Sequence, residues 1–371
     1  MHGRHSKCFV IITAILASCT RPESQPGRHH PDPHFLVREI QPTDTIALLA
    51  QSSDSMLLPQ PGADSVQWRT IGQLQGDEAQ VLREITQVLP TPDGRLLLLD
   101  RKSSQVHVYS PTGTHLADIG RPGRGPGDLF SPMAMAMGPD GSLLIGDMQR
   151  RIQKFRPDGN SFAFDTSFSL IASPIGLCTV DSLIIVQGSD MAGESLIQEY
   201  DSQGHLVRRF GSVYRSPLEV VNLEGARGVL ACDSARGLIG FAPHGLIGEF
   251  RVFSLDGATI RLTILEGFNP IAVTELPNEG FETHLPDGDI HGVRSLTRLQ
   301  SGAWVLQVSV TTRELLKEGV LTQKVITLFL PDSGRGYPAS SRMPLLLANT
   351  GRRPIYLTSA LFPQITWRID K

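Results

Sequence analysis

The chain has 371 residues, of which 40% are hydrophobic and 19% are charged, and its formal net charge is -3 at pH 7. This length and composition are typical of a folded protein with a large core and exclude an intrinsically disordered chain. The small net charge produces no overall field toward nucleic acid, so we expect no nucleic-acid partner. The 36 glycines and 26 prolines indicate many turns, as in an all-β fold.

The N-terminal residues 1–19 are predicted to be a lipoprotein signal peptide. A short basic start precedes an apolar run from Phe9 to Ala17, which is too short to span a membrane. The run ends in Leu-Ala-Ser-Cys, which resembles a bacterial lipobox, so Cys19 is the expected lipidation site. Ordinary secretory cleavage beside an incidental cysteine is the alternative. We expect a lipid-anchored protein of the bacterial cell envelope, periplasmic or surface-facing, with the membrane as a partner through its anchor.

Residues 20–61 are predicted to form a flexible tether, because they are rich in proline, histidine and polar residues and show no periodicity. The tether histidines His29, His30 and His34 are not expected to form a metal site, since a disordered segment does not preorganise ligands. Beyond the tether, Cys178 and Cys232 are the remaining cysteines. Export permits a disulfide between them, and two buried thiols are the alternative.

Residues 62–371 are predicted to form a β-propeller built from a repeat. The segments "VLPTPDGRLLLLDRKSSQVHVYSPTGTHLADIG" from Val88 and "MAMGPDGSLLIGDMQRRIQKFRPDGNSFAFDTS" from Met135 share one layout of strands and turns. Each Pro-Asp-Gly is a tight-turn signal, and each unit reads as a four-stranded antiparallel meander of about 40–50 residues, the length of a propeller blade.

Weaker copies in the same phase cover residues 175–211, 220–264 and 295–334, and the C-terminal copy supplies only three strands. The segment from Val66 to Gly72 is predicted to be the missing outer strand of that last blade. This pairing would close the ring between the two ends of the propeller and remove its exposed edge. The count predicts six four-stranded blades.

The Pro-Asp-Gly turn, the strand "LLIGD", the segment "RRIQKF" and the connector "IGRPGRGPGDLF" resemble NHL repeats. The sequence is similar more broadly to exported six-bladed propeller proteins of bacteria. This resemblance implies a propeller but no single activity, since NHL-type propellers serve as binding platforms, as scaffolds for protein or RNA, and occasionally as enzymes. The connector itself is predicted to join two blades, because no helix follows it to form a phosphate cradle.

Repeated acids and clustered arginines are the first candidate functional residues. Asp100, Asp147 and Asp233 are each predicted to end the second strand of a blade and to accept backbone hydrogen bonds in the next turn. Arginines cluster around the blade connections, and convergence on one face would make a surface for an anion or a partner. Those arginines are Arg121, Arg124, Arg150 and Arg151, followed by Arg208, Arg209 and Arg236.

We expect the propeller to act as a scaffold that binds an envelope protein or glycan, without a cofactor and without an assigned catalytic residue. The alternative is a metal-dependent hydrolase or lyase similar to the gluconolactonase-like propellers, which hold a divalent ion in the central channel. Glu84, Asn222 and His291 would be its ligands near the inner strands, whereas aliphatic Leu177, Met135 and Val221 in the channel would oppose it.

The segment from Glu266 to His291 interrupts the repeat and is about 25 residues longer than its equivalents, so it is predicted to be a long loop on one face of the propeller. Its aromatic residues Phe268 and Phe281 and the acids Glu275, Glu279 and Glu282 are candidates for a ligand rim. A loop that only covers the channel is the alternative.

Overall fold

The structure is a computed structural model. It describes residues 29–30, 41–48, 67–72, 81–188, 195–216, 219–275, 281–317, 324–339, 343–350, 353–359 and 364–369. The predicted lipidation site Cys19, together with His34 and Glu279, lies outside these residues. Within them no helix is long and apolar enough to cross a bilayer.

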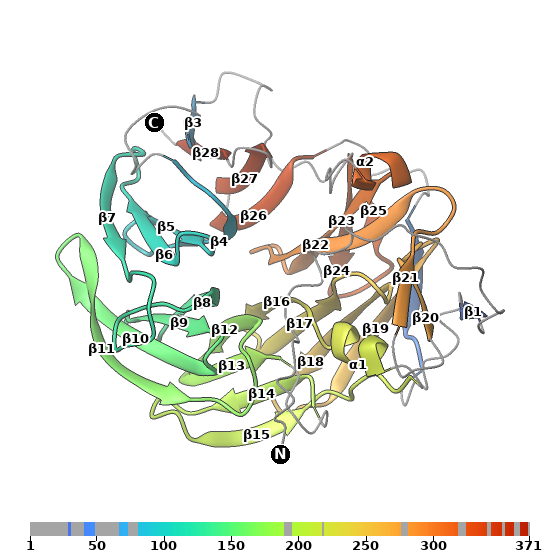
Figure 1. Cartoon of the computed structure of the whole chain (residues 1–371), viewed down its shortest axis with the longest axis horizontal. Coiled ribbons are helices and arrows are strands. Elements are labelled where there is room, and N and C mark those ends of the chain that lie inside the picture. The colour runs from blue at the N-terminus through green and yellow to red at the C-terminus, as the bar shows by residue number, and fades with distance from the viewer. Residues whose placement is uncertain are drawn as a thin grey trace, which may run out of the picture.

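The described residues form six blades arranged in a ring (Figure 1), which confirms the predicted six-bladed propeller. Blade 1 contains β4 (Ile85–Pro90), β5 (Leu96–Asp100), β6 (Gln105–Tyr109) and β7 (His115–Ile119). Blade 2 contains β8 (Pro132–Met137), β9 (Leu143–Asp147), β10 (Arg151–Asp158) and β11 (Ser161–Ser169). Blade 3 contains β12 (Gly176–Val180), β13 (Leu183–Gln187), β14 (Ile197–Tyr200) and β15 (Leu206–Phe210).

The second half of the ring departs more from the simple repeat. Blade 4 contains β16 (Gly228–Asp233), β17 (Leu238–Pro243), β18 (Glu249–Ser254), β19 (Thr259–Glu266) and the added β2 (Asp44–Ala47). Blade 5 contains β22 (Ile290–Arg298), β23 (Ala303–Thr311), β24 (Lys324–Pro331) and β25 (Tyr337–Pro338), with the short helix α2 (Arg313–Lys317) between β23 and β24. Blade 6 contains β26 (Leu345–Thr350), β27 (Arg353–Ser359), β28 (Gln364–Ile369) and β3 (Gln67–Ile71).

Each blade is covered on both faces by its neighbours, which explains the continuous apolar runs in second strands such as β5 and β9. Strand β5 shows this directly, because successive side chains of a strand point to opposite faces. Leu97 and Leu99 pack in a cluster with residues of blade 2, whereas Leu96 and Leu98 pack with Trp367 and other residues of blade 6. The hydrophobic core is therefore a set of layers between blades, and no blade can bury both of its faces alone.

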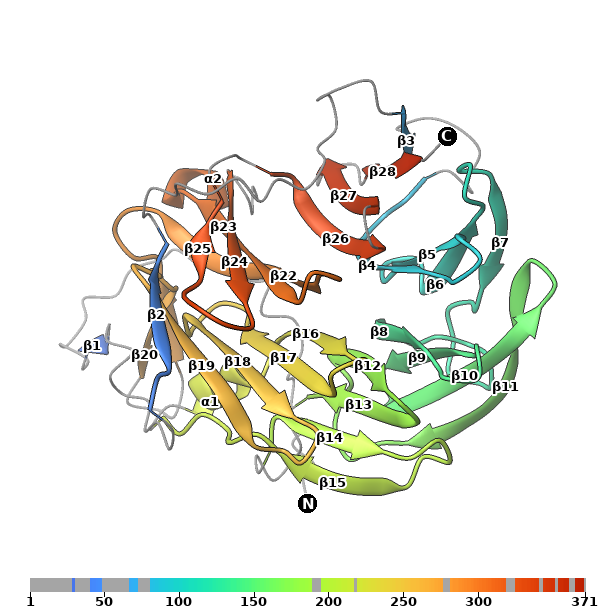
Figure 2. The ribbon, with the colours of Figure 1, turned by 180° about the vertical axis from the view of Figure 1, so that it is seen from behind.

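The ring is closed by the N-terminal strand, as predicted for residues 66–72. Strand β3 pairs antiparallel with β28, with Thr70 opposite Thr366 and Arg69 opposite Trp367. Figures 1 and 2 both show this blue strand beside the red C-terminal strand. Trp367 also reaches blade 1, since its indole N–H donates to the backbone oxygen of Pro111 (3.3 Å).

The connector between blades 1 and 2 is a fixed loop, in agreement with its predicted role. Gly120 and Gly127 have positive φ values of 78° and 77°, and an added Cβ at Gly120 would meet Leu129 at 2.5 Å. The Gln153 side chain accepts a hydrogen bond from the Gly127 N–H (2.8 Å) and donates to the backbone oxygen of Asp128 (2.5 Å). The glycines are therefore required by backbone conformation and close packing.

Two predictions in blade 4 are wrong. The segment around Val220 and Val221 was expected to be an inner strand, but it forms the helix α1 (Glu219–Gly225), in which Asn222 exchanges hydrogen bonds with the backbone of Ser216. As a result the next strand, β16, becomes the first strand of the blade, and Asp233 ends the first strand and not the second. Local tertiary contacts here override the β-propensity of valine.

Part of the predicted tether forms the strand β2, which pairs in parallel with β19 (Figure 2). Ile46 and Leu48 are 4% and 2% exposed in the core between blades 4 and 5. Asp44 forms an ion pair with Arg261 (2.5 Å), and Thr43 donates a hydrogen bond to the backbone oxygen of Leu262 (2.9 Å). This short apolar stretch is ordered because blade 4 offers an outer edge and a cover for its side chains.

Side chains also join neighbouring blades directly. Gln87 of blade 1 donates to the Met135 carbonyl (2.8 Å) and accepts from the Met135 N–H (2.7 Å) in blade 2. Gln307 of blade 5 likewise donates to the Pro344 carbonyl (3.0 Å), just before β26, and accepts from the Leu346 N–H (2.5 Å) in β26 of blade 6. Cys178 on β12 and Cys232 on β16 form a disulfide, so the inner strands of blades 3 and 4 are covalently linked.

We expect the double substitution Cys178→Ser/Cys232→Ser to lower the free energy of unfolding by about 4 kcal/mol, because the bridge closes a loop with a sequence separation of 54 and so restricts the unfolded chain. Urea denaturation measures this change, with the reduced wild-type chain as the control that has the same sequence. Equal denaturation midpoints for the oxidised and reduced wild type would show that the bridge does not stabilise the fold.

Candidate functional site

The three residues predicted as channel ligands have separate local partners. Glu84 lies just before β4, where its carboxylate forms an ion pair with Arg101 of the same blade. Asn222 lies in α1 and bonds to Ser216, so it is not on an inner strand. His291 lies on β22, the inner strand of blade 5. The channel metal site stays a prediction.

His291 is the buried member of this set, with 5% of its surface exposed. Its Nδ1 accepts a hydrogen bond from the Asn269 N–H (2.8 Å), and its ring lies 5.8 Å from the ring of Phe268. Burial lowers the pKa of His291 below its usual value of 6.5. The neutral imidazole accepts the hydrogen bond from Asn269. It thereby links the backbone near the start of the inserted segment to the end of that segment at His291.

The predicted aliphatic channel residues face neighbouring blades. Met135 belongs to the core between blades 1 and 2, and Leu177 to the core between blades 2 and 3. Val221 lies in α1 and packs against the core between blades 3 and 4. Met135 and Leu177 lie on inner strands, whose side chains point to the two faces of a blade, and Val221 packs from the helix, so all three cover seams between blades.

The predicted arginine surface surrounds the connector of blades 1 and 2. Arg121 is 79% exposed and pairs with Asp128 (2.6 Å), and the Arg124 guanidinium lies 4.4 Å from the centre of the Phe130 ring. Arg150 is exposed. Arg151 is mostly buried, pairs with Asp147 (3.0 Å) and donates to the backbone oxygen of Asp128 (2.9 Å). Arg151 therefore fixes the connector, and anion binding by the other three stays a prediction.

The repeated aspartates accept backbone hydrogen bonds, as expected. Asp100 is fully buried and accepts from the N–H groups of Arg83 (2.7 Å), Glu84 (3.0 Å) and two residues of the following turn. Asp147 accepts from the Gln149 N–H (2.9 Å). Asp233 accepts from the Arg236 N–H (3.2 Å) and pairs with Arg298 of blade 5 (2.8 Å).

A cluster of two histidines and one aspartate on blade 1 was not predicted. Nδ1 of His107 lies 2.6 Å from Oδ1 of Asp118, and Nε2 of His115 lies 2.8 Å from the same oxygen. Nε2 of His107 points toward Asp100, with 3.6 Å to Oδ2. Burial alone lowers the pKa of His107, but the neighbouring carboxylates of Asp100 and Asp118 outweigh it, so the pKa is raised above 6.5.

A β-bulge brings these side chains to one face of the blade. His107 stands opposite Asp118 and Tyr109 stands opposite His115, so Leu116 is the extra residue between the two pairs. In a regular strand His115 and Asp118 would point to opposite faces, because side chains alternate. Their spacing of three residues hides the cluster in the sequence, and only the register of β6 against β7 reveals it.

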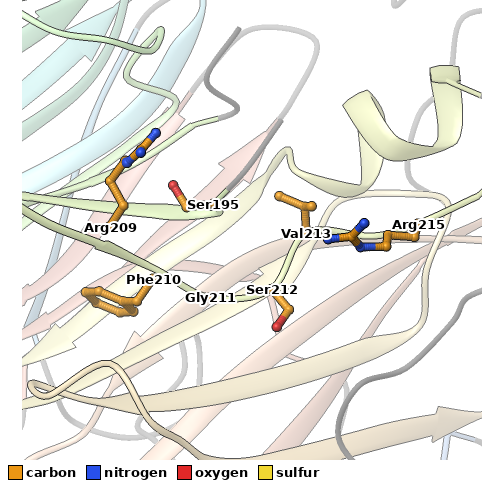
Figure 3. A pocket seen from close by; sticks show the side chains of 7 residues that line it. All are labelled: Ser195, Arg209, Phe210, Gly211, Ser212, Val213 and Arg215. Atoms are coloured by element: carbon orange, nitrogen blue, oxygen red, sulfur yellow. The ribbon is translucent and has the colours of Figure 1, made fainter. Parts of the chain in front are cut away.

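A hollow of about 340 Å³ opens at the outer edge of blade 3 (Figure 3). It is lined by the end of β15, by Ser195 two residues before β14, and by the loop that leads to blade 4. Figure 3 shows Arg209 beside Ser195, and Arg215 beyond Val213 on the other side. The full lining comprises Ser195, Arg209, Phe210, Gly211, Ser212, Val213 and Arg215.

The loop that forms one wall of this hollow is anchored to blade 4. The Tyr214 hydroxyl donates to Glu249 Oε1 (2.5 Å), and Arg251 pairs with the same oxygen (2.6 Å). Arg251 also donates to the backbone oxygen of Ser212 (2.7 Å) and lies 4.5 Å from the centre of the Tyr214 ring. These buried contacts hold the backbone that carries Arg215.

The inserted segment forms a hairpin, β20 (Ala272–Glu275) with β21 (Phe281–His284), and β1 (His29–His30) pairs with β20 through its backbone. The segment was predicted to be a long loop, so its strands are a correction. Phe281 is 41% exposed, whereas Phe268 packs against His291. The two aromatic residues of the predicted ligand rim therefore differ: Phe281 is exposed, whereas Phe268 contacts His291 of blade 5.

Residues 73–191 match a protein family described as a 6-bladed beta-propeller. A predicted exported protein from Bacteroides fragilis NCTC 9343 is similar in structure, with a TM-score of 0.56, 10% identity, and coverage of 88% of this chain and 99% of that protein. A member of the DUF4221 family from Bacteroides vulgatus ATCC 8482 has a TM-score of 0.54, 8% identity, and coverage of 82% and 96%. No curated protein matches the chain in sequence. At these identities the similarity supports the fold alone.

Substitution of Asp100 by Asn tests the role of the repeated aspartates. Burial alone raises the pKa of Asp100, but the interaction with His107 and the backbone N–H donors lower it to about 2. The ionised carboxylate therefore stabilises the fold above pH 3.8, and this stability is lost as the pH falls toward 2. At pH 7 we expect Asp100→Asn to lower the free energy of unfolding by about 2 kcal/mol.

The measurement is urea denaturation of both proteins from pH 7 to pH 2, with Asp158→Asn in an exposed hairpin as the matched control. The difference between wild type and Asp100→Asn should shrink below pH 3.8. A difference that stays constant over the whole range would contradict the role of the charge.

Proposed function

We propose that this chain is an exported, lipid-anchored β-propeller of the bacterial cell envelope that binds a negatively charged group of an envelope protein or glycan. The apolar run from Phe9 to Ala17 and the Leu-Ala-Ser-Cys sequence at Cys19 support export and anchoring. The disulfide between Cys178 and Cys232 is consistent with an oxidising compartment, where such bonds persist.

The hollow on blade 3 is the observation that carries the binding proposal. Its lining includes Arg209 and Arg215 together with Ser195 and Ser212, around a space of about 340 Å³. Arginine presents several N–H donors in a rigid plane that fits carboxylate, sulfate or phosphate groups, and its hydrogen bonds to anions are stronger than neutral ones. A ligand with two acidic groups could contact Arg209 and Arg215 together.

The backbone around the hollow is held in place by contacts within blades 3 and 4. Arg209 lies on β15, paired with Gln198 of β14, and the loop with Arg215 is held by Tyr214, Glu249 and Arg251. A preorganised site loses less conformational freedom when a ligand binds. The ligand class follows from the charge of the lining, whereas its identity requires a binding assay.

We expect Arg209→Ala/Arg215→Ala to reduce affinity for an acidic ligand at least tenfold, because both cationic groups are removed. The probes are uronate-containing oligosaccharides, poly-glutamate peptides and neutral oligosaccharides, titrated against the full chain by calorimetry. Binding should also weaken as salt rises, since exposed charges are screened. Arg156→Ala removes another exposed arginine, 71% exposed and paired with Asp165, and serves as the matched control.

Unchanged affinity in the double variant would place the ligand elsewhere on the propeller, and selective binding of neutral oligosaccharides would contradict the proposed ligand class. Failure of all three probe classes to bind the wild type would contradict the proposal for this hollow.

We expect Cys19→Ser to move the chain from the membrane fraction to the soluble fraction of the envelope, because it removes the proposed lipid attachment. Cell fractionation and immunoblotting of the full-length protein measure the distribution. Cys8→Ser is the matched control, since it removes the other cysteine of the predicted signal peptide and leaves the Cys178–Cys232 disulfide intact. Retention of Cys19→Ser in the membrane fraction, to the same degree as the control, would contradict lipid anchoring at this residue.

A further inference from the structure

We propose that His107, His115 and Asp118 on the outer strands of blade 1 form a binding site for a transition-metal ion such as Zn²⁺. Each residue offers one ligand atom, and the three atoms lie within 4.8 Å of one another. Imidazole nitrogen and carboxylate oxygen are ligands that Zn²⁺ prefers in proteins. The site is separate from the hollow on blade 3 and independent of the function proposed for it.

Two of the three distances between the ligand atoms lie somewhat below those of a tetrahedral site. Ligand atoms at the usual zinc distances of about 2.0–2.1 Å are separated from each other by about 3.3 Å. Oδ1 of Asp118 lies 2.6 Å from His107 Nδ1 and 2.8 Å from His115 Nε2, which are hydrogen-bond distances. An ion can replace these two hydrogen bonds if the ligand atoms move apart by about 0.5 to 0.7 Å.

Asp100 completes the arrangement on the buried side. With the ion on Nδ1 of His107, the proton of that ring lies on Nε2, which is buried, has no hydrogen-bond partner among the described residues and is 3.6 Å from Asp100 Oδ2. Metal-binding histidines commonly direct their second ring nitrogen at a carboxylate, which fixes the tautomer and the ring orientation. Asp100 is itself held by four backbone N–H groups.

The three ligands are carried by rigid elements. His107 and Asp118 are directly paired across β6 and β7, and the bulge at Leu116 places His115 on the same face. The ring of Tyr109 stands edge-on to the ring of His115 at 5.4 Å and limits its rotation. Ligands on paired strands keep their geometry better than ligands on loops.

The exposure of the ligands indicates a site with access to solvent. The side chain of His107 is 6% exposed, whereas those of His115 and Asp118 are 24% and 32% exposed. Three protein ligands leave one position of a tetrahedral ion for water or a small anion, which is the pattern of open zinc sites. The geometry thus fits an accessible ion with a replaceable ligand.

The test is calorimetric titration of the metal-free full chain with Zn²⁺, together with Co²⁺ titration followed by visible absorption. We expect one ion per chain with the spectrum of four-coordinate Co²⁺. His115→Ala and Asp118→Ala should each lower the affinity at least tenfold, because even partners of metal ligands act on this scale. His107→Gln should do the same, and Gln153 occupies the equivalent strand position in blade 2, so this variant is compatible with the fold.

Two controls separate this site from other histidines. His205→Ala removes an exposed histidine paired with Asp201 (3.0 Å) on blade 3 and should leave the affinity unchanged. The triple variant His29→Ala/His30→Ala/His34→Ala should also retain the bound ion. Absence of stoichiometric binding would overturn the proposal. So would binding that survives His115→Ala, Asp118→Ala and His107→Gln in chains that retain the wild-type melting temperature.

Discussion

Closure of the ring by β3 is the interaction on which the rest of this structure depends. Every blade buries its two faces against neighbours, so a propeller with an open seam would expose the apolar faces of blades 1 and 6. The pairing of β3 with β28 completes blade 6 with a strand from the opposite end of the described propeller. Trp367 extends this closure to the β6–β7 turn of blade 1 through Pro111. By closing the ring, these few residues therefore stabilise the packing of all six blades.

In the closed ring, the two candidate sites lie on outer strands and connections. Inner-strand side chains are used to seal the seams between blades, and glutamines such as Gln87 and Gln307 and the Cys178–Cys232 disulfide tie neighbouring blades together. Polar groups with solvent access occur on inner strands, as at Thr86 and Arg294, and also on outer strands and connections. The cluster of His107, His115 and Asp118 on blade 1 and the arginine-lined hollow on blade 3 are both of this kind.

The fold was largely predictable because the repeat is local, whereas the sites depend on register and packing. The Asp-Gly turns, the alternating strands and the unpaired last blade predicted six blades and the closing strand. Helix α1 was missed because its valines favour strands, and β2 was missed because its partner is distant in sequence. The histidine cluster needed the bulge at Leu116, which no residue spacing revealed. Glu84, Asn222 and His291 showed polar character in the sequence, but their separate partners are set by tertiary contacts.

Hydrogen–deuterium exchange of the full chain tests the central claim that the N-terminal strand closes the propeller as an integral part of the fold. The account predicts that peptides covering β3 and β28 exchange as slowly as peptides from the central strands of blades 1 and 6, because all of them open only when the ring opens. Fast exchange in β3, with continued protection of β26, β27 and blade 1, would show that the ring holds without its closing strand and would contradict the account.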